Sequence, residues 1–317
     1  MINEIIYSVV VPVFNEEEVL NEVYTRLIVV MEKLDKNYEI IFIDDGSTDK
    51  SFEIINKLCE IDKKVRVIQF SRNFGHQIAI SAGIDYVSGD AVIMMDADLQ
   101  HPPELIPELI KKWEEGYDIV YTVRKESKSI GLIKKITSKF FYSLINSLSK
   151  IDIPEGTADF RLLSRTVVEN LKNFKERTRF IRGLISWVGY KKIGISYIAE
   201  ARFAGRPKYS FKKMIRFALI GITSFSSVPL YISTILGFII AGISFIYAIF
   251  AIYSKFFTDT VVIPGWTSTL VSVLFLGGVQ LIAIGILGEY LDKVYEEVKQ
   301  RPLYIVKELK GFNEHKI

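Results

Sequence analysis

Two acidic clusters, each at the end of an apolar segment, contain the residues of this chain best suited to chemistry. Residues 40–49 read IIFIDDGSTD, and residues 91–103 read AVIMMDADLQHPP. In both, a continuous apolar run stops at carboxylates, as happens where a fully buried parallel strand reaches the carboxyl edge of its sheet. Open α/β folds bind their ligands at that edge, so the two clusters together predict one ligand site.

A single alanine separates Asp96 from Asp98 in the second cluster. At a strand end, where regular alternation breaks, such a D-x-D pair can direct both carboxylates at one hard divalent cation, with a diphosphate as co-ligand. Asp44 and Asp45 lie one strand earlier. The four carboxylates predict a site for a nucleoside diphosphate with Mg²⁺ or Mn²⁺, in which Asp45 accepts a hydrogen bond from a nucleobase N–H. The competing interpretation, helix capping, applies best to Asp49 and Glu104.

The composition lies between that of a soluble enzyme and that of a membrane-embedded protein. Of 317 residues, 49% are hydrophobic and 24% are charged, and the formal net charge is +3. We expect about two domains and no nucleic-acid partner. The single cysteine, Cys59, excludes an intramolecular disulfide and fits a reducing compartment. No basic region precedes the first apolar segment, so we expect no cleavable signal peptide.

The first half of the chain alternates strand and helix patterns, which predicts βαβ units, a mostly parallel sheet and right-handed crossovers. We therefore expect an α/β, Rossmann-like domain at residues 1–209. Strands are expected at residues 5–14, 40–43, 65–70, 91–95 and 119–122, within 153–163, and at 191–201. Helices are expected at residues 16–36, 47–61, 75–87, 102–115 and 130–150.

The second half contains two long segments without a charged residue, 217–254 and 260–288. Since a membrane-spanning helix needs about 20 apolar residues, we expect two spans within residues 229–292. Pro229 divides the first segment, and residues 210–228 before it are expected to form an amphipathic helix in the membrane interface. Residues 293–317 are expected to form a C-terminal tail. Buried helices of a soluble protein are the competing interpretation.

Basic residues are gathered on one side of the two expected spans. Several precede the first span and follow the second, whereas the loop between them holds only Lys255. The positive-inside rule therefore places the catalytic domain and both termini in the cytoplasm, in a multi-pass protein of the inner (plasma) membrane. Polar residues such as Gln280 within the spans predict association of several copies through their membrane helices.

A second set of candidate ligands lies just before the first span, in an R-x-x-x-R-x-K-x-S pattern. Arginine forks bind phosphate through paired hydrogen bonds, and lysine adds a point charge. Attraction to anionic lipid, about 1 kcal/mol per basic residue, is the competing interpretation, and both uses are compatible for an enzyme acting on a lipid phosphate. The residues expected to bind an acceptor phosphate here are Arg202, Arg206, Lys208 and Ser210.

These motifs together resemble the family 2 glycosyltransferases of GT-A fold. The resemblance rests on VVVPVFNEEE, IDDGSTD, SRNFGHQIAISAG, DADLQHPPE and ADFRLLSR, followed by a C-terminal helix pair. It is closest for the polyprenyl-phosphate sugar transferases, which include dolichol-phosphate mannosyltransferases and the bactoprenol glucosyltransferases of O-antigen modification. By this resemblance, Asp96, Asp98 and Gln100 surround the metal. The nucleotide pocket is lined by Pro12, Val13, Asn15, Glu16 and Asp45.

The third motif of the site is Ala158-Asp159-Phe160-Arg161. The resemblance implies that Asp159 is a base for the acceptor. A phosphate monoester has its second pKa near 6 and is already largely dianionic, so the alternative roles of Asp159 are to orient the acceptor or to stabilise oxocarbenium character. We assign Asp159 and Asp98 as catalytic and Arg161 to the acceptor phosphate. Arg72, after the third strand, is assigned to the nucleotide, with a structural salt bridge as the competing interpretation.

The predicted function is an inverting transfer of one hexose to undecaprenyl phosphate on the cytoplasmic leaflet. UDP-glucose is the expected donor; GDP-mannose, UDP-aminoarabinose and N-acetylhexosamine donors are alternatives. A separate flippase would then carry the product across the membrane. The chain lacks the Q-x-x-R-W-type motif and the additional spans expected of a processive synthase. The alternative from another class is a lipid flippase or membrane scaffold that retains a nucleotide-binding fold.

Overall fold

The computed structural model describes residues 5–125, 154, 156–177, 179–198, 223, 226–257 and 265–312. The chain divides into two compact units. The first, Met1–Ala218 with Arg301–Ile317, is an α/β unit, and the second, Leu219–Gln300, is helical. The expected helix at residues 130–150 and nearly all of the expected interfacial helix at residues 210–228 lie outside the described residues.

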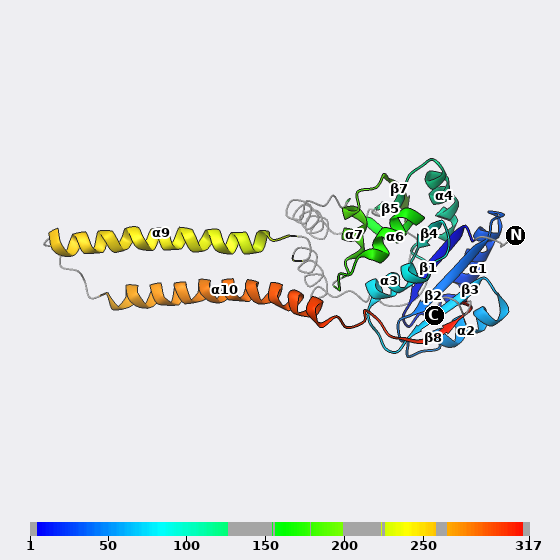
Figure 1. The fold of residues 1–317 in the computed structure, drawn as a ribbon, viewed down its shortest axis with the longest axis horizontal. Helices are drawn as coiled ribbons and strands as arrows, with labels where there is room; N and C mark the ends of the chain where they lie inside the picture. The colour runs from blue at the N-terminus through cyan, green and yellow to red at the C-terminus, as the bar shows by residue number, and fades with distance from the viewer. Residues whose placement is uncertain are drawn as a thin grey trace. The chain divides into compact units, whose positions relative to one another are not determined.

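A single eight-stranded sheet forms the centre of the α/β unit, in the order β7-β5-β6-β4-β1-β2-β3-β8 (Figure 1). The middle strands β3, β2, β1 and β4 run parallel to one another, as the apolar runs predict. Every residue of β1, β2 and β4 is buried, since helices cover both faces of this part of the sheet. The strands are β1 Tyr7–Val13, β2 Tyr38–Asp44, β3 Val65–Phe70, β4 Ala91–Met94, β5 Ile119–Lys125, β6 Thr157–Ser164, β7 Lys192–Ile198 and β8 Val306–Lys310.

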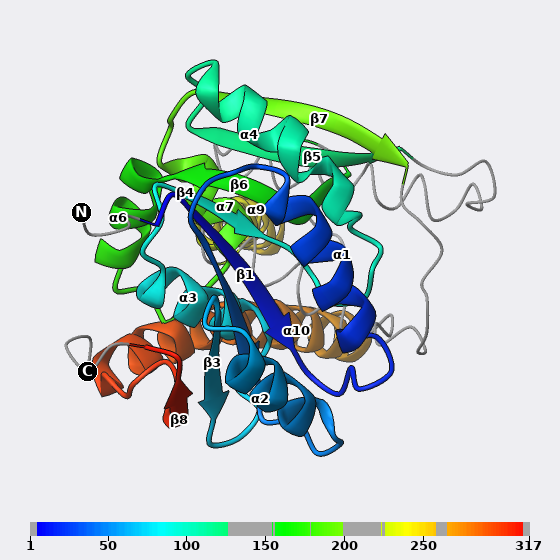
Figure 2. The same ribbon diagram turned by 90° about the vertical axis from the view of Figure 1, so that its right-hand side faces the viewer.

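The helices are divided between the two faces of the sheet (Figure 2). Apolar residues of α1, α2 and α4 pack with alternate residues of β1 and β2 in one core, whereas α3 packs on the opposite face beside α6, to which α7 is joined. This is the layered arrangement expected of an α/β domain. The helices are α1 Leu20–Glu32, α2 Ser51–Ile61, α3 His76–Tyr86, the 3₁₀ turn η1 Pro103–Leu105, α4 Ile106–Glu114, α6 Arg165–Asn173 and α7 Ile181–Trp187.

Strand β6 runs antiparallel to both of its neighbours, β4 and β5. In its register with β4, Met94 lies opposite Arg161 and Ala91 lies opposite Ser164. The first residues of β6 therefore lie at the same edge of the sheet as the last residues of β4. This reversal brings the ADFR motif to the edge where the acidic clusters of the parallel strands end.

The expected C-terminal tail is instead part of the α/β unit. Strand β8 pairs antiparallel with β3 and forms one edge of the sheet. Phe312, just beyond it, packs against Tyr86 with a ring-centroid distance of 5.3 Å. The boundary expected at residue 293 is also displaced, because α10 continues to Lys299. Without β8, the edge of β3 would expose unpaired backbone N–H and C=O groups. The C-terminal segment provides hydrogen-bond partners for these groups.

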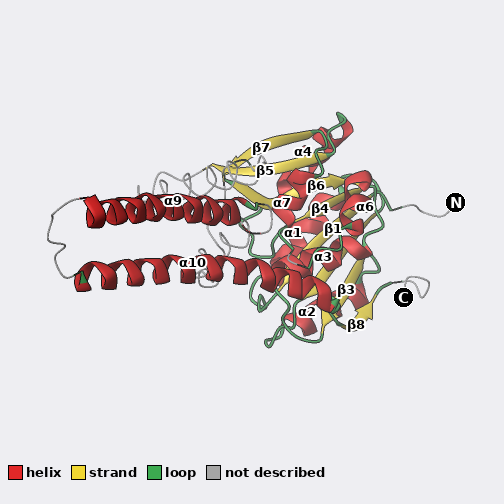
Figure 3. Cartoon of the chain, turned by 60° about the vertical axis from the view of Figure 1, so that its left-hand side comes forward, coloured by secondary structure: helices red, strands yellow, loops and turns green. Residues whose placement is uncertain are grey.

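The helical unit contains two long apolar helices, α9 Val228–Phe257 and α10 Trp266–Lys299 (Figure 3). Both are long and apolar enough to cross a membrane, over Val228–Tyr247 and Val271–Lys299, with mean hydropathies of 2.0 and 2.2. None of either window is buried within the chain, which argues against the interpretation as core helices. Their exposed apolar surface indicates association with a membrane.

A close contact between α3 and β1 gives a test of the packing that holds α3 against the sheet. A Cβ atom added at Gly83 would lie 2.2 Å from Val10 Cγ1 and 3.1 Å from Ile43 Cδ1. Gly83→Ala should therefore lower the free energy of unfolding by about 1–3 kcal/mol through overpacking, measured by thermal unfolding of the full chain. Gly237→Ala is the matched control, since nothing lies within 4 Å of its added Cβ. Equal unfolding temperatures for both variants would contradict this packing.

Candidate active site

The loops that follow β1 and β2 are joined by hydrogen bonds in both directions. The amide of Asn15 donates to Ser47 Oγ at 3.0 Å, and the amide of Thr48 donates to Asn15 Oδ1 at 2.8 Å. The amide of Glu16 donates to Ser51 Oγ at 2.8 Å. Asn15 holds a left-handed backbone conformation, φ 54°, which asparagine tolerates better than most residues. These contacts fix the loops on either side of the predicted nucleotide pocket.

Asp44 and Asp45, at the end of β2, are both buried. Asp44 Oδ1 accepts the Ser47 amide at 3.2 Å. Asp45 Oδ1 accepts the Phe74 amide at 2.6 Å, and its Oδ2 accepts the Gly75 amide at 3.0 Å. Burial raises the pKa of both carboxyls, and the amide hydrogen bonds oppose that rise. Asp45 therefore anchors the loop after β3, and its contact with a nucleobase stays a prediction.

Gly46 allows this loop to approach the end of β2. Its φ is +68°, and an added Cβ would lie 2.5 Å from the carbonyl carbon of Arg72 and 2.7 Å from the amide nitrogen of Asn73. No other residue type fits both the backbone conformation and the space. The Arg72 side chain is exposed and its guanidinium lies over the Phe74 ring, 4.1 Å from the centroid. The described contacts of Arg72 thus include no salt bridge, and its role toward the nucleotide remains a prediction.

Asp96 follows β4 and is positioned through a buried histidine. The Asp96 amide donates to Nδ1 of His101 at 3.1 Å. The His101 ring stacks on Phe160 with a centroid distance of 5.4 Å and meets Tyr197 edge-on at 6.3 Å. Because His101 is only 6% exposed, it is neither a surface residue nor a simple helix-start residue. Through this hydrogen bond, His101 positions the backbone at the start of the D-x-D motif.

Asp98 and Gln100 belong to a tight turn immediately after Asp96. Asp98 Oδ1 accepts the Gln100 amide at 3.1 Å, and Leu99 between them has φ 58°. Gln100 Oε1 accepts from a guanidinium nitrogen of Arg124, at the end of β5, at 3.4 Å. The turn keeps the two carboxylates of the motif at one end of β4.

The oxygen atoms of this turn fit a divalent cation that also binds a diphosphate. Asp96 Oδ1 is buried and accepts no hydrogen bond from the described residues. Among those residues, no group of three or more His, Cys, Asp or Glu side chains is arranged to hold a metal ion. Mg²⁺ is typically held by one or two carboxylates together with substrate phosphates rather than by a cage of protein ligands. The donor set Asp96, Asp98 and Gln100 suits such a shared site.

Asp159, at the start of β6, is held in a bidentate ion pair. Nε of Arg182, in α7, lies 2.6 Å from Asp159 Oδ1, and the Arg182 Nη2 donates to Oδ2 at 2.9 Å. A second cation, Arg161, lies 3.6 Å from Oδ1. Burial would raise the pKa of Asp159, but Arg182 foremost, with His76 and Arg161, holds it well below its ordinary value. The carboxylate therefore stays ionised and is a weak proton acceptor.

His76 bridges the carboxylates of Asp96 and Asp159. Its Nε2 lies 3.3 Å from Asp96 Oδ1 and 3.6 Å from Asp159 Oδ2. Burial lowers the pKa of His76, but Asp96 and Asp159 raise it more, to about 9. In the absence of metal, His76 is therefore a cation at neutral pH, and it reduces the repulsion between the two acids.

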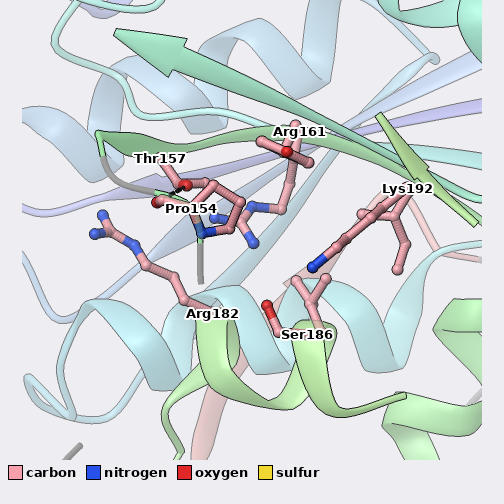
Figure 4. A pocket seen from close by; sticks show the side chains of 9 residues that line it. Pro154, Thr157, Arg161, Arg182, Ser186 and Lys192 are labelled. Carbon is pink, nitrogen blue, oxygen red and sulfur yellow. Dashed lines mark hydrogen bonds between the residues drawn. The ribbon is translucent and has the colours of Figure 1, made fainter. Parts of the chain in front are cut away.

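A small cavity lies behind Asp159, between the sheet and α7 (Figure 4). The side chains of Arg161, Ser186 and Lys192 point into it. Its volume of about 10 Å³ is near the minimum for one water molecule and too small for a phosphate. Arg161 is 3% exposed and donates to the Ala158 carbonyl at 2.7 Å. Its described contacts support the start of β6, and direct binding of the acceptor phosphate stays a prediction.

The remaining predicted residues fall into two groups. Pro12 and Val13 are the last residues of β1, and both are buried beside the end of β2. The basic group expected at the acceptor phosphate lies outside the described residues: Arg202, Arg206, Lys208 and Ser210.

Comparison with known proteins identifies the family of this fold and site. The sequence model of glycosyl transferase family 2 matches residues 8–172, just over half of the chain. The chain belongs to glycosyltransferase family 2. The matched region contains both acidic clusters and the ADFR motif, and the GT-A fold expected from the sequence is confirmed.

Relatives extend the similarity over nearly the whole chain. The uncharacterised glycosyltransferase YkcC of Bacillus subtilis is 47% identical over 100% of this chain and 98% of its own length. The bactoprenol glucosyl transferase of Shigella phage SfII is also 47% identical, over 95% of this chain and 97% of its own. Among solved structures, the mannosyl-3-phosphoglycerate synthase of Rubrobacter xylanophilus is 14% identical, with a TM-score of 0.48 over 68% of this chain and 71% of that one. The family model and the two relatives show that the protein is an enzyme, a glycosyltransferase, and the interpretation as a flippase or scaffold is set aside.

Three residues of the site are not assigned by the sequence analysis: Arg182, His76 and His101. Arg182 stands in a segment that mixes arginines with aromatics, and nothing in its spacing relates it to Asp159. The available signal was chemical, because a buried carboxylate at an active site requires a cation. His101 follows the D-x-D motif in the sequence, but its contact with the Asp96 amide depends on the fold of the turn.

The Asp159–Arg182 pair predicts a graded loss of glycosyl transfer. Arg182→Ala removes two charge-assisted hydrogen bonds, worth about 1.5–3 kcal/mol each, so transfer should fall at least roughly 100-fold at 1.4 kcal/mol per tenfold. Arg182→Lys keeps the charge without the paired hydrogen bonds, so its transfer rate should fall less. Steady-state transfer rates test this, and thermal unfolding of each variant shows whether it is folded. Glu169→Gln, which removes a surface partner of Arg165, is the control, and wild-type rates for Arg182→Ala would contradict the role of the pair.

Proposed function

We propose that this enzyme transfers one glucose from UDP-glucose to a polyprenyl phosphate, undecaprenyl phosphate in bacteria. The lipid phosphate attacks the anomeric carbon in line, the bond to the nucleoside diphosphate breaks, and a β-linked polyprenyl monophosphate sugar forms. The observation that carries the proposal is the 47% identity to a bactoprenol glucosyl transferase over 95% of this chain, including α9 and α10. The GDP-mannose, UDP-aminoarabinose and N-acetylhexosamine donors are the alternatives within the same proposal.

A divalent cation, Mg²⁺ or Mn²⁺, is proposed at Asp96, Asp98 and Gln100. When bound, it would neutralise the diphosphate and act as a Lewis acid for the leaving group. The buried Asp96 Oδ1, which accepts no hydrogen bond among the described residues, supports this assignment. The nucleotide itself is proposed to bind between the joined loops after β1 and β2 and the loop after β3.

Asp159 is proposed to orient the acceptor rather than to remove a proton. Its pKa is held well below the ordinary value by Arg182, whereas the acceptor phosphate, with a second pKa near 6, needs little deprotonation at neutral pH. The pair also presents a guanidinium whose side chain is 23% exposed. Arg182 is thereby proposed to face the acceptor phosphate together with the basic residues that precede α9.

The proposed location of the reaction is the cytoplasmic leaflet of the plasma membrane. Nucleotide sugars are made in the cytoplasm, and the basic flanks of α9 and α10 favour that side for both termini. A separate flippase would then move the product, and several copies are proposed to associate through their apolar helices. Arg202, Arg206, Lys208 and Ser210 are proposed to bind the lipid phosphate at the membrane surface.

Glycolipid formation by the full chain tests the activity and its metal dependence. Purified protein with undecaprenyl phosphate and Mn²⁺ should produce labelled glycolipid from UDP-glucose faster than from GDP-mannose or UDP-N-acetylglucosamine. Asp98→Asn should reduce the rate at least about 100-fold, since a metal ion supplies several kcal/mol of transition-state stabilisation. Glu108→Gln, an exposed acid of α4, is the matched control. Full activity in excess EDTA would exclude the metal, and no transfer from any nucleotide sugar would exclude the proposed reaction.

Labelling of single cysteines in intact cells tests the topology. In a Cys59→Ala background, Thr258→Cys between α9 and α10 should react with a membrane-impermeant maleimide. Asn313→Cys, after β8, should react only after the membrane is opened. The expectation follows from the basic residues that flank both helices. The opposite labelling pattern would place the catalytic domain outside the cytoplasm.

A further inference from the structure

The segment that follows α10 contacts the loop that closes the predicted nucleotide pocket. The Ser71 amide, at the start of that loop, donates to the carbonyl of Ile305 at 3.0 Å. In the preceding pair of the sheet, Phe70 of β3 lies opposite Val306 of β8. The pairing of β8 with β3 therefore continues by one hydrogen bond into residues 71–75, defined here as the donor loop.

Tyr304 adds a side-chain connection to the same loop. Its ring stacks on Phe70, with a centroid distance of 5.1 Å and an interplanar angle of 19°. Phe70 in turn meets Phe74 edge-on at 5.6 Å. The amide of Phe74 donates to Asp45 Oδ1 at 2.6 Å. A row of three aromatic rings thus leads from Tyr304 to the backbone that Asp45 holds.

The Tyr304 hydroxyl reaches the other side of the donor loop. It donates to Asp85 Oδ2 at 2.9 Å, and Asp85 lies in α3, the helix that begins with His76. Tyr304 therefore contacts both the strand that leads into the donor loop and the helix that leads out of it. A hydrogen bond to a charged acceptor contributes about twice as much as one between neutral groups.

We propose that Tyr304 is a positioning residue for nucleotide binding, because it holds the donor loop between β3 and α3. It touches neither substrate nor metal and acts through Phe70, Phe74 and Asp85. The affinity of the enzyme for the nucleotide then depends on the chain segment that contains Tyr304. Residues 300–303 connect this segment to the end of α10. The choice of a uridine nucleotide as the ligand rests on the proposed function. The effect of Tyr304 on the donor loop rests only on the contacts described above.

Nucleotide binding and local hydrogen exchange on the full chain in detergent test this role. Tyr304→Ala should weaken UDP–Mn²⁺ binding, measured by calorimetry, roughly tenfold, while the KM for lipid phosphate stays within about twofold. Tyr304→Phe keeps the ring stack and loses only the bond to Asp85, so it should recover most of the affinity. The Phe74 and Gly75 amides should exchange faster in Tyr304→Ala. Ile305→Ala, whose side chain is 54% exposed, is the matched control and should match wild type.

The outcomes separate this inference from the proposed function. Wild-type UDP affinity and wild-type exchange at residues 74 and 75 in Tyr304→Ala would overturn the inference. The inference would also be overturned if Tyr304→Ala lost UDP binding and lipid binding equally, in proportion to the fall in its unfolding temperature. That result is expected if Tyr304 only stabilises the fold. If Tyr304→Ala does not fold, Tyr304→Leu decides, because it removes the ring stack and the hydroxyl bond but keeps apolar bulk: wild-type UDP affinity and wild-type exchange at residues 74 and 75 would overturn the inference. A wild-type chain that binds no UDP would exclude the proposed donor, and the exchange measurement would still decide the positioning role.

Discussion

Repulsion between carboxylates at one edge of the sheet is the constraint that the rest of the site must offset. Asp44, Asp45, Asp96, Asp98 and Asp159 converge there from β2, β4 and β6. Backbone amides are directed at Asp45 and Asp98, and Arg182 and His76 are directed at Asp159. Buried charges persist only where such partners compensate for lost hydration. Asp44 Oδ2 and Asp96 Oδ1 are buried oxygens of this edge that accept no hydrogen bond from the described residues, and Asp96 belongs to the D-x-D turn proposed to hold the cation.

The antiparallel strand β6 places the two proposed groups of site residues on different elements. The residues proposed to bind the nucleotide come from the ends of parallel strands. Asp159, proposed to orient the acceptor, enters the same edge from the beginning of a reversed strand, and its partner Arg182 comes from α7. His76 contacts a carboxylate of each group, Asp96 and Asp159.

Local patterns predicted the parallel centre of the sheet and the acidic edge, because both are encoded in contiguous residues. Apolar runs that end in Asp44 and Asp96 identify buried strands and their carboxyl ends without any knowledge of pairing. The direction of β6 and the addition of β8 to β3 could not be read in this way, since strand pairing joins segments far apart in the sequence. The VKELK sequence of β8 is polar and short, as edge strands often are, and it resembles a tail. Arg182 was missed for the same reason, as its partner Asp159 lies in another element.

The position of β8 also determines the order in which the protein can be made. Domains generally fold from the N-terminus during synthesis, yet the strand that covers β3 is translated after both apolar helices. The hydrogen-bonding edge of β3 thus stays open until α9 and α10 have been translated. The sheet is completed only afterwards, so a chain interrupted before its last residues would carry both apolar helices and an unfinished sheet.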